Sequence, residues 1–190
     1  MYKFILFLLL LSSLHADLIL TNDTNKYDDF KIGYFYDVNS SLSIEDINQT
    51  TFTQEIPNQF SLGYRDGTAW FKLKIQNRSN TKDFVLHFNE PFWSSLDLYE
   101  HKNGVWRVDK NALNIPMHQR SLKDNNPAYE LKLNKNTTTT IYLKGITTAG
   151  HIGEFTLFTH DEFFRPNRFT KSTIYMFFIV ILFTLIILNI

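Results

Sequence analysis

Three tryptophans in polar surroundings are the residues of this sequence best suited to recognise another molecule. Trp70, Trp93 and Trp106 each stand near charged or hydroxyl-bearing residues. Sugar rings pack on aromatic faces while polar groups fix their hydroxyls, and small-ligand sites in general combine apolar walls with a few polar groups. Each tryptophan could instead pack in the core or beneath a loop, and the sequence leaves both interpretations open.

A short polar segment, Pro116-Met117-His118-Gln119-Arg120-Ser121, adds two side chains that could hydrogen-bond an oxygen-rich ligand. We expect this segment in a loop or at a strand edge. His118 and Arg120 both offer N–H donors. A simple surface charge is the alternative for Arg120, because arginine is mostly exposed in folded proteins. The predicted ligand-binding residues are Trp70, Trp93, His118 and Arg120.

Catalytic and metal-binding patterns are weak. The six histidines include no pair at i and i+4, no loop has the calcium-binding pattern, and the chain has no cysteine. It also lacks a Gly-x-Ser-x-Gly motif and a glycine-rich phosphate loop. We therefore expect no enzyme activity, no cofactor and no metal site. A glycosidase is a remaining hypothesis, because four carboxylates could supply the required pair: Glu90, Asp97, Glu100 and Asp109.

Two of the Asn-x-Ser/Thr sequences, at Asn39 and Asn48, stand out as candidate glycosylation sites because an acidic residue lies two positions before the asparagine. Asp37 precedes the first asparagine by two positions, and Asp46 precedes the second in the same way. This added acidic residue resembles the extended acceptor of bacterial N-glycosylation systems. Coincidence in an asparagine-rich chain is the alternative.

The elements that must position these residues are mostly β-strands. Alternating or β-branched runs between polar turns predict strands at 32–36, 70–76, 84–88, 96–100, 105–108, 129–133, 139–144 and 155–159. Ser43 and Asp46 predict a short capped helix. No strand alternates with a long amphipathic helix, so the predicted fold class is all-β, a β-sandwich or jelly roll.

The strand at 70–76 has two distinct faces. Phe71, Leu73 and Ile75 form an ordinary core face, whereas Trp70 begins the opposite, lysine-bearing face. We expect Trp70 to pack beneath the turn at 64–68 rather than to meet a ligand, and both roles remain open.

Both ends of the chain are apolar. Lys3, the run Phe4–Leu11 and the small residue Ala16 predict a signal peptide over residues 1–16, with an uncleaved anchor as the alternative. Residues 172–190 carry no charge and predict a transmembrane helix. From residue 174 onward such a helix is about 26 Å long, near the lower limit for a span.

Residues 17–168 then form one predicted domain in the bacterial periplasm, anchored to the inner membrane. Three basic residues just before the span would favour the cytoplasm by the positive-inside rule alone, but that rule weakens beside long translocated domains. The chain has 19 basic and 19 acidic residues, so nucleic-acid binding has no electrostatic basis. Without disulfides, stability must come from apolar packing, for which 18 phenylalanines are available.

The order of these segments resembles the type-2 extracellular domain of bacterial seven-transmembrane receptors with diverse intracellular signalling modules. The resemblance covers about residues 30–160 and is carried by Gly63, Trp70–Asn77, the segment from Pro91 to Tyr99, and Leu143-Lys144. It implies a periplasmic jelly-roll-like sensor that binds carbohydrate or a related small ligand. The family usually continues with seven helices and an output domain, whereas this sequence shows one helix, and Lys144 stands where an arginine is common.

Two functional hypotheses follow. The first is a membrane-anchored periplasmic sensor domain that binds a carbohydrate or similar small molecule, lacks an output domain of its own, and works beside other membrane signalling proteins. The second is a periplasmic interaction module that docks onto another membrane protein through its β edges or its helix.

Overall fold

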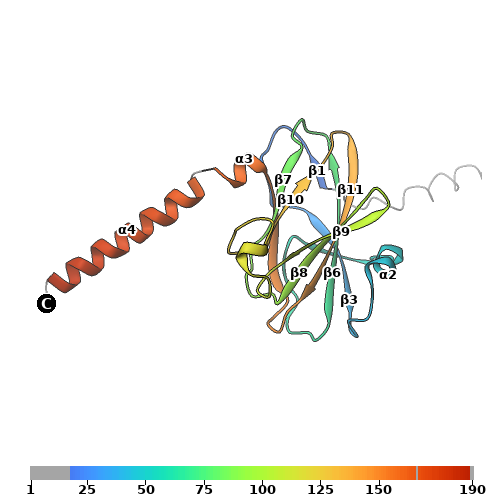
Figure 1. Cartoon of the computed structure of the whole chain (residues 1–190), viewed down its shortest axis with the longest axis horizontal. Helices are drawn as coiled ribbons and strands as arrows, with labels where there is room; N and C mark the ends of the chain where they lie inside the picture. The colour runs from blue at the N-terminus through green and yellow to red at the C-terminus, as the bar shows by residue number, and fades with distance from the viewer. Residues whose placement is uncertain (1–17, 166, 189–190) are drawn as a thin grey trace, which may run out of the picture.

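A computed structural model of the chain describes residues 18–165 and 167–188. Its regular structure is mostly sheet, with 45% strand and 17% helix. The predicted signal peptide over residues 1–16 lies outside the described residues. The described chain folds into two sheets that pack face to face, with a long helix projecting from one end (Figure 1). The predicted all-β fold class is confirmed for this body.

Among the described residues, the larger sheet has seven strands in the order β4-β3-β6-β11-β8-β9, with β1 beside β6. All of its pairs are antiparallel except β1 with β6, which is parallel. Its strands are β1 (Leu18–Leu20), β3 (Lys31–Asp37), β4 (Gln54–Pro57), β6 (Thr68–Asn77), β8 (Ser95–Lys102), β9 (Val105–Asn111) and β11 (Thr137–Ile146).

The smaller sheet has five antiparallel strands among the described residues, in the order β10-β7-β12-β2 with β5 also beside β12. They are β2 (Lys26–Tyr27), β5 (Gln59–Ser61), β7 (Asp83–Phe88), β10 (Ala128–Lys132) and β12 (Ile152–Thr159). The helices are α2 (Ile44–Gln49), the 3-10 turn η2 (Met117–Gln119), α3 (His160–Phe163) and α4 (Asn167–Leu188).

An aromatic core fills the space between the two sheets. Phe71 of β6 is fully buried, and its ring centroid lies 5.3 Å from that of Phe155 on the facing strand β12. Leu73 and Ile75 point to the same core, while the residues between them point outward, because side chains alternate along a strand. The predicted core face of this strand is therefore confirmed.

Helix α2 covers part of the outer face of the larger sheet. Its start is fixed by a reciprocal cap: the backbone N–H of Asp46 donates to the Ser43 hydroxyl, and the backbone N–H of Ser43 donates to the Asp46 carboxylate at 2.9 Å. Ile44 and Ile47, three residues apart, lie on one side of the helix and are buried. The sheet consequently has a second, smaller apolar cluster on its outer side.

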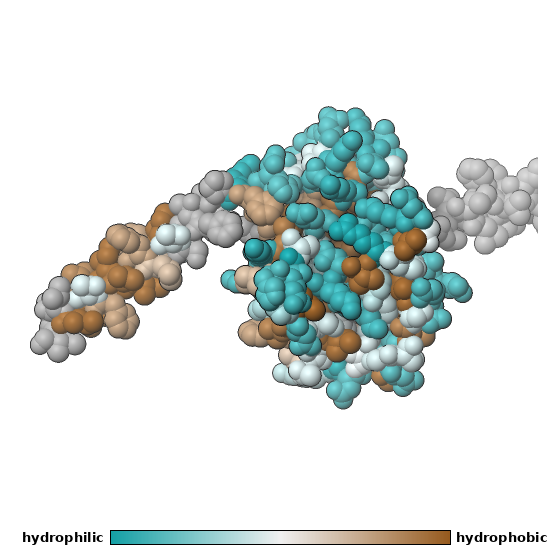
Figure 2. Space-filling view, in the orientation of Figure 1, coloured by the Kyte–Doolittle hydropathy of each residue, from teal (hydrophilic) through white to brown (hydrophobic). Residues whose placement is uncertain are grey.

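Helix α4 carries most of the exposed apolar surface. Figure 2 shows this surface along the projecting helix, whereas the visible face of the sandwich is mostly hydrophilic. Large apolar side chains from residue 174 to residue 187 are exposed. Within residues 18–165 and 167–188, however, no helix combines the length and the apolar character needed to cross a membrane. The span predicted over residues 172–190 is not confirmed.

Candidate ligand-binding site

Trp70 lies on the outer face of β6, where its indole is fully buried. It belongs to the apolar cluster that α2 forms with the sheet through Ile44 and Ile47. The Lys144 ammonium group lies 5.4 Å from the centroid of the Trp70 ring, in cation–π contact. Packing is thus the observed state of Trp70, but α2 covers it rather than the turn at 64–68 that we expected.

A row of alternating charges crosses the outer face beside Trp70. Strand register places Lys144 of β11 opposite Trp70, Asp97 of β8 opposite Lys144, and Lys110 of β9 opposite Asp97. Cβ atoms of directly opposed residues in antiparallel strands are about 5 Å apart. The Asp97 carboxylate therefore has a lysine on the strand at either side.

Two partly exposed aromatic side chains lie farther along the same outer face, Tyr99 nearer to this row than Trp106. Tyr99 lies two residues beyond Asp97 on the same face of β8, and Trp106 projects from β9 toward Tyr142 of β11, with ring centroids 5.9 Å apart. Partly exposed rings can accept a flat apolar face while their edges stay in contact with water. We call the following residues the outer-face site: Asp97, Tyr99, Trp106, Lys110 and Lys144.

The Asp97 carboxylate is held in an environment that is unfavourable for a charge. Burial raises the pKa of Asp97 above its usual range, and the nearby Lys110 and Lys144 ammonium groups lower it by less. Neither lysine approaches closely enough to form an ion pair, and no other described residue hydrogen-bonds the carboxylate. Its oxygens are consequently available to donors from outside the chain.

Trp93, the second predicted ligand residue, lies in the main core on the other side of the larger sheet. Its indole N–H donates to the Ile152 carbonyl at 3.0 Å. The ring rests on Gly145 of β11, where a Cβ atom would overlap it. The structure therefore separates Trp93 from Trp70, and each indole is fully buried.

Arg120 and His118 occupy the long connection between β9 and β10. The Arg120 guanidinium donates to the carbonyls of Ile115 at 2.9 Å, Asp124 at 3.0 Å and Ala112 at 2.8 Å, so it holds this connection in place. His118 is exposed on η2. The four predicted ligand residues are not brought together at one place in the structure.

The residues of the outer-face site were only partly visible in the sequence. The predicted strand at 96–100 contains Asp97 and Tyr99, and the family resemblance drew attention to Lys144. Asp97 lies opposite both Lys144 and Lys110 because of the register between β8, β9 and β11. The alternation of side chains within one strand does not specify that register.

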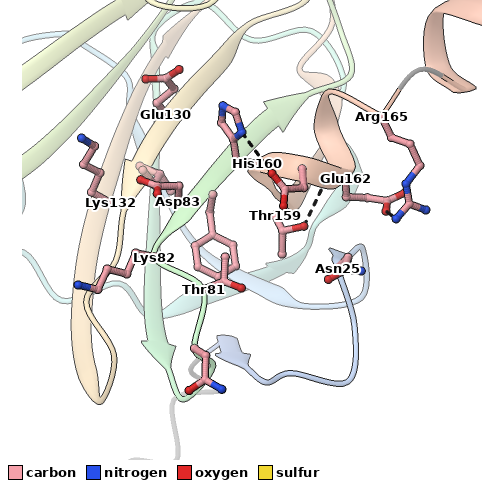
Figure 3. Close-up of a pocket in the computed structure, with 14 residues that line it drawn as sticks. Asn25, Thr81, Lys82, Asp83, Glu130, Lys132, Thr159, His160, Glu162 and Arg165 are labelled. Atoms are coloured by element: carbon pink, nitrogen blue, oxygen red, sulfur yellow. Dashed lines mark hydrogen bonds and ion pairs between the residues drawn. The ribbon is translucent and has the colours of Figure 1, made fainter.

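A cavity of about 720 Å³ lies elsewhere, between the end of the smaller sheet and α3 (Figure 3). Charged side chains of both signs line it, including Lys82, Asp83 and Lys132 from the β7 and β10 side. On the α3 side, Arg165 pairs with Glu162 at 2.9 Å. Because its lining includes no tryptophan or tyrosine and two of its charges already pair with each other, we do not choose it as the ligand site.

The four carboxylates considered for glycoside cleavage do not converge. Asp97 and Glu100 alternate to opposite faces of β8, and Glu100 is buried with Lys102 at 2.7 Å. Asp109 precedes the residue paired with Asp97, so it points to the other face of β9. No group of three or more potential metal ligands occurs among the described residues.

The two glycosylation candidates differ in their surroundings. Asn39 is exposed in the turn after β3. Asn48 lies in α2, where its side-chain oxygen accepts a hydrogen bond from the Tyr142 hydroxyl at 3.1 Å. Modification at either residue stays a prediction, and Asn39 is the more accessible acceptor.

Comparison with known proteins adds one family. No curated protein matches the chain. The family model described as 7TMR-DISM extracellular 2 matches residues 30–159, which contain every strand from β3 to β12, α2 and the outer-face site. The chain therefore belongs to the 7TMR-DISM extracellular 2 family, as its sequence pattern indicated.

Proposed function

We propose that this domain is the sensor part of a receptor and that it binds a carbohydrate or a similar polyhydroxylated molecule at the outer-face site. Family membership supports an extracellular sensor domain. The observation that carries the ligand class is the partly buried Asp97 carboxylate, which lies between two lysines and beside the partly exposed Tyr99 ring.

The side chains suit neighbouring hydroxyl groups. An ionised carboxylate accepts two hydrogen bonds, and an ammonium group donates up to three. Asp97 would accept from two adjacent hydroxyls while Lys144 or Lys110 donates to their oxygens, and Tyr99 or Trp106 would support the apolar face of the ring. Charge-assisted hydrogen bonds of this kind are stronger than neutral ones.

Thermal unfolding of the full-length chain in a mild detergent tests the proposal with a panel of neutral mono- and oligosaccharides. A true ligand stabilises the folded state, by about 2.7 kcal/mol at one hundred times its Kd. We expect Asp97→Asn to abolish this stabilisation. Glu130→Gln, at an exposed carboxylate on the outer edge of the smaller sheet, should leave it intact. Equal stabilisation of the wild type and Asp97→Asn by every active sugar would refute the assignment.

A docking module remains the second candidate function, because β9 is an edge strand of the larger sheet. Val105 and Val108 on this strand are 68% and 40% exposed, and an edge strand with free backbone groups can pair with another chain. Photo-crosslinking from residue 108 in native membranes tests it. A specific protein adduct, together with no response across the sugar panel, would favour docking over ligand sensing.

We further propose that the domain lies in the periplasm and that residues 172–190 hold it at the inner membrane. The support is the uncharged sequence of this segment and the exposed apolar surface of α4. An alkaline phosphatase fused near Asn167 should be active if the domain is exported. An inactive phosphatase paired with a fluorescent cytoplasmic reporter at the same position would refute this location.

A further inference from the structure

A group of buried polar atoms lies at one end of the sandwich, apart from the outer-face site. His151 is fully buried, and its ring lies 5.3 Å from the Trp93 ring and 6.1 Å from the Tyr36 ring by their centroids. Neither imidazole nitrogen has a hydrogen-bond partner among the described residues, and the same holds for the hydroxyl of buried Tyr34. Three polar atoms are thus buried without a well-formed hydrogen bond, and their weaker contacts are with Arg65: its side chain with the Tyr34 hydroxyl and its backbone with the imidazole.

Such atoms are uncommon in folded proteins. More than nine in ten buried polar groups have a partner, since a buried donor or acceptor without one destabilises the fold. An apolar side chain in place of His151 would avoid the problem and could still stack on Trp93. A polar ligand bound here would supply the missing hydrogen bonds to these atoms.

One cation faces this group. The Arg65 guanidinium carbon lies 5.3 Å from the centroid of the Tyr36 ring, and the Arg65 charge acts on both His151 and Tyr34. Burial, with a smaller effect of the Arg65 charge, lowers the pKa of His151 below its usual value, and a backbone contact with Arg65 raises it by less, so the neutral imidazole predominates at pH 7. The group therefore offers one positive charge and several neutral hydrogen-bonding atoms.

The loop from Leu62 to Gly67, which joins β5 to β6, covers the buried group. Leu62 N–H donates to the His151 carbonyl, and His151 N–H donates to the Gly63 carbonyl, both at 2.8 Å. At the other end, the Tyr36 hydroxyl donates to the Asp66 carbonyl. Gly63 and Gly67 have φ of +76° and +141°, values that other residues rarely adopt. The loop is thus bounded by two glycines and held by three hydrogen bonds.

We propose that Tyr34, Arg65 and His151 form a second binding site, for a small carboxylate, which is reached when the loop from Leu62 to Gly67 opens. The Arg65 guanidinium would bind the carboxylate in its bidentate geometry. Tyr34 and His151 would donate to its oxygens or to an adjacent hydroxyl, and Trp93 and Tyr36 form the walls. The fully buried His151 requires a movement of the loop for entry, as in enzymes whose loops close over a ligand.

The test uses sodium acetate, lactate, pyruvate and gluconate as probes with the full-length chain in detergent. Thermal unfolding gives the stabilisation, and the proton–carbon NMR signal of the His151 ring, assigned with His151→Gln, gives the location. We expect at least one probe to raise Tm saturably by about 3 °C or more and to shift the His151 signal. Arg65→Gln should abolish both effects.

Matched variants separate this site from the outer-face site. Arg78→Gln removes an exposed arginine on the sheet at the end of β6 and should respond like the wild type. Asp97→Asn should keep the carboxylate response, and Arg65→Gln should keep the response to sugars. The proposal is overturned if no probe shifts the His151 signal, or if Arg65→Gln responds as the wild type does. Because Arg65 is exposed, its variant should fold even if His151→Gln does not.

Discussion

Asp97 is a residue whose charge opposes folding while it serves the proposed binding site. Its pKa is raised in the folded state, mainly by burial. Between the unfolded and folded pKa values the folded chain binds more protons, so stability falls as pH rises through this window. Above the folded pKa the carboxylate is ionised and the destabilisation is fully present.

Asp97→Asn should therefore stabilise the protein at pH 7 while it removes sugar binding. The asparagine amide has the shape of the aspartate side chain but is neutral, so the fold no longer buries a charge. We therefore expect Tm to rise by about 1 to 3 °C. Differential scanning calorimetry without ligand measures this change. A lower Tm for Asp97→Asn would show that the two lysines stabilise the carboxylate by more than burial costs it.

His151 gives stability an opposite dependence on pH. Its folded pKa lies below the unfolded value of 6.5, so the unfolded chain binds more protons as the pH falls. Stability should be complete above about pH 7 and should decline below the unfolded pKa. Urea unfolding at about pH 7.5 and pH 5.5 measures the decline, which His151→Gln should reduce. The same decline in both proteins would assign it to other groups.

At the scale of elements, the Trp93 ring packs directly against the backbone of β11 at Gly145. Gly145 permits this contact, because any Cβ atom there would overlap the indole. Trp93 cannot easily move, since it is fully buried and hydrogen-bonded to Ile152. The position therefore requires glycine for space rather than for backbone freedom.

Gly145→Ala should destabilise the fold by about 2 kcal/mol or more, since overpacking a tight core forces side chains or backbone to shift. Chemical unfolding measures the change. Gly150→Ala is the matched control, because a Cβ atom there would make only ordinary contacts with the flexible Ile152 side chain. Similar losses in the two variants would indicate a backbone effect common to both glycines.

The sequence predicted long elements better than short ones. Each predicted strand from 70–76 to 155–159 is present, because four or more residues are enough to show which side chains alternate into the core. The short strands β1, β2, β4 and β5 have two to four residues and carry no such pattern. Sequence also identified Trp70 and Trp93, but their burial on opposite sides of one sheet depends on α2 and on the facing sheet.

At the scale of the whole molecule, the two sheets depend on strands that are distant in sequence. Strand β11 lies between β6 and β8, and β12 lies beside β7 in the smaller sheet. Without the chain beyond residue 136, both sheets would lose a central strand, and their core faces would be exposed to water.

A fragment of residues 18–136 should therefore fail to fold cooperatively. We expect neither a sigmoidal urea transition nor dispersed amide signals in its proton–nitrogen NMR spectrum, whereas the full chain should show both. The longer fragment 18–165 serves as the control, since it contains every strand of the two sheets. A cooperative transition in the shorter fragment would mean that the first ten strands form a stable unit by themselves.

The late position of β11 also governs what happens while the polypeptide is being made. Strand β6 ends at Asn77 and β11 ends at Ile146, so 69 residues (146 minus 77) must follow before β6 gains its neighbour on that side. At ribosomal speeds of about 5 to 20 residues per second this takes about 3 to 14 s. During that interval the nascent chain exposes one unpaired edge of an aromatic strand, which favours a chaperone-held form and folding only after β11 has emerged.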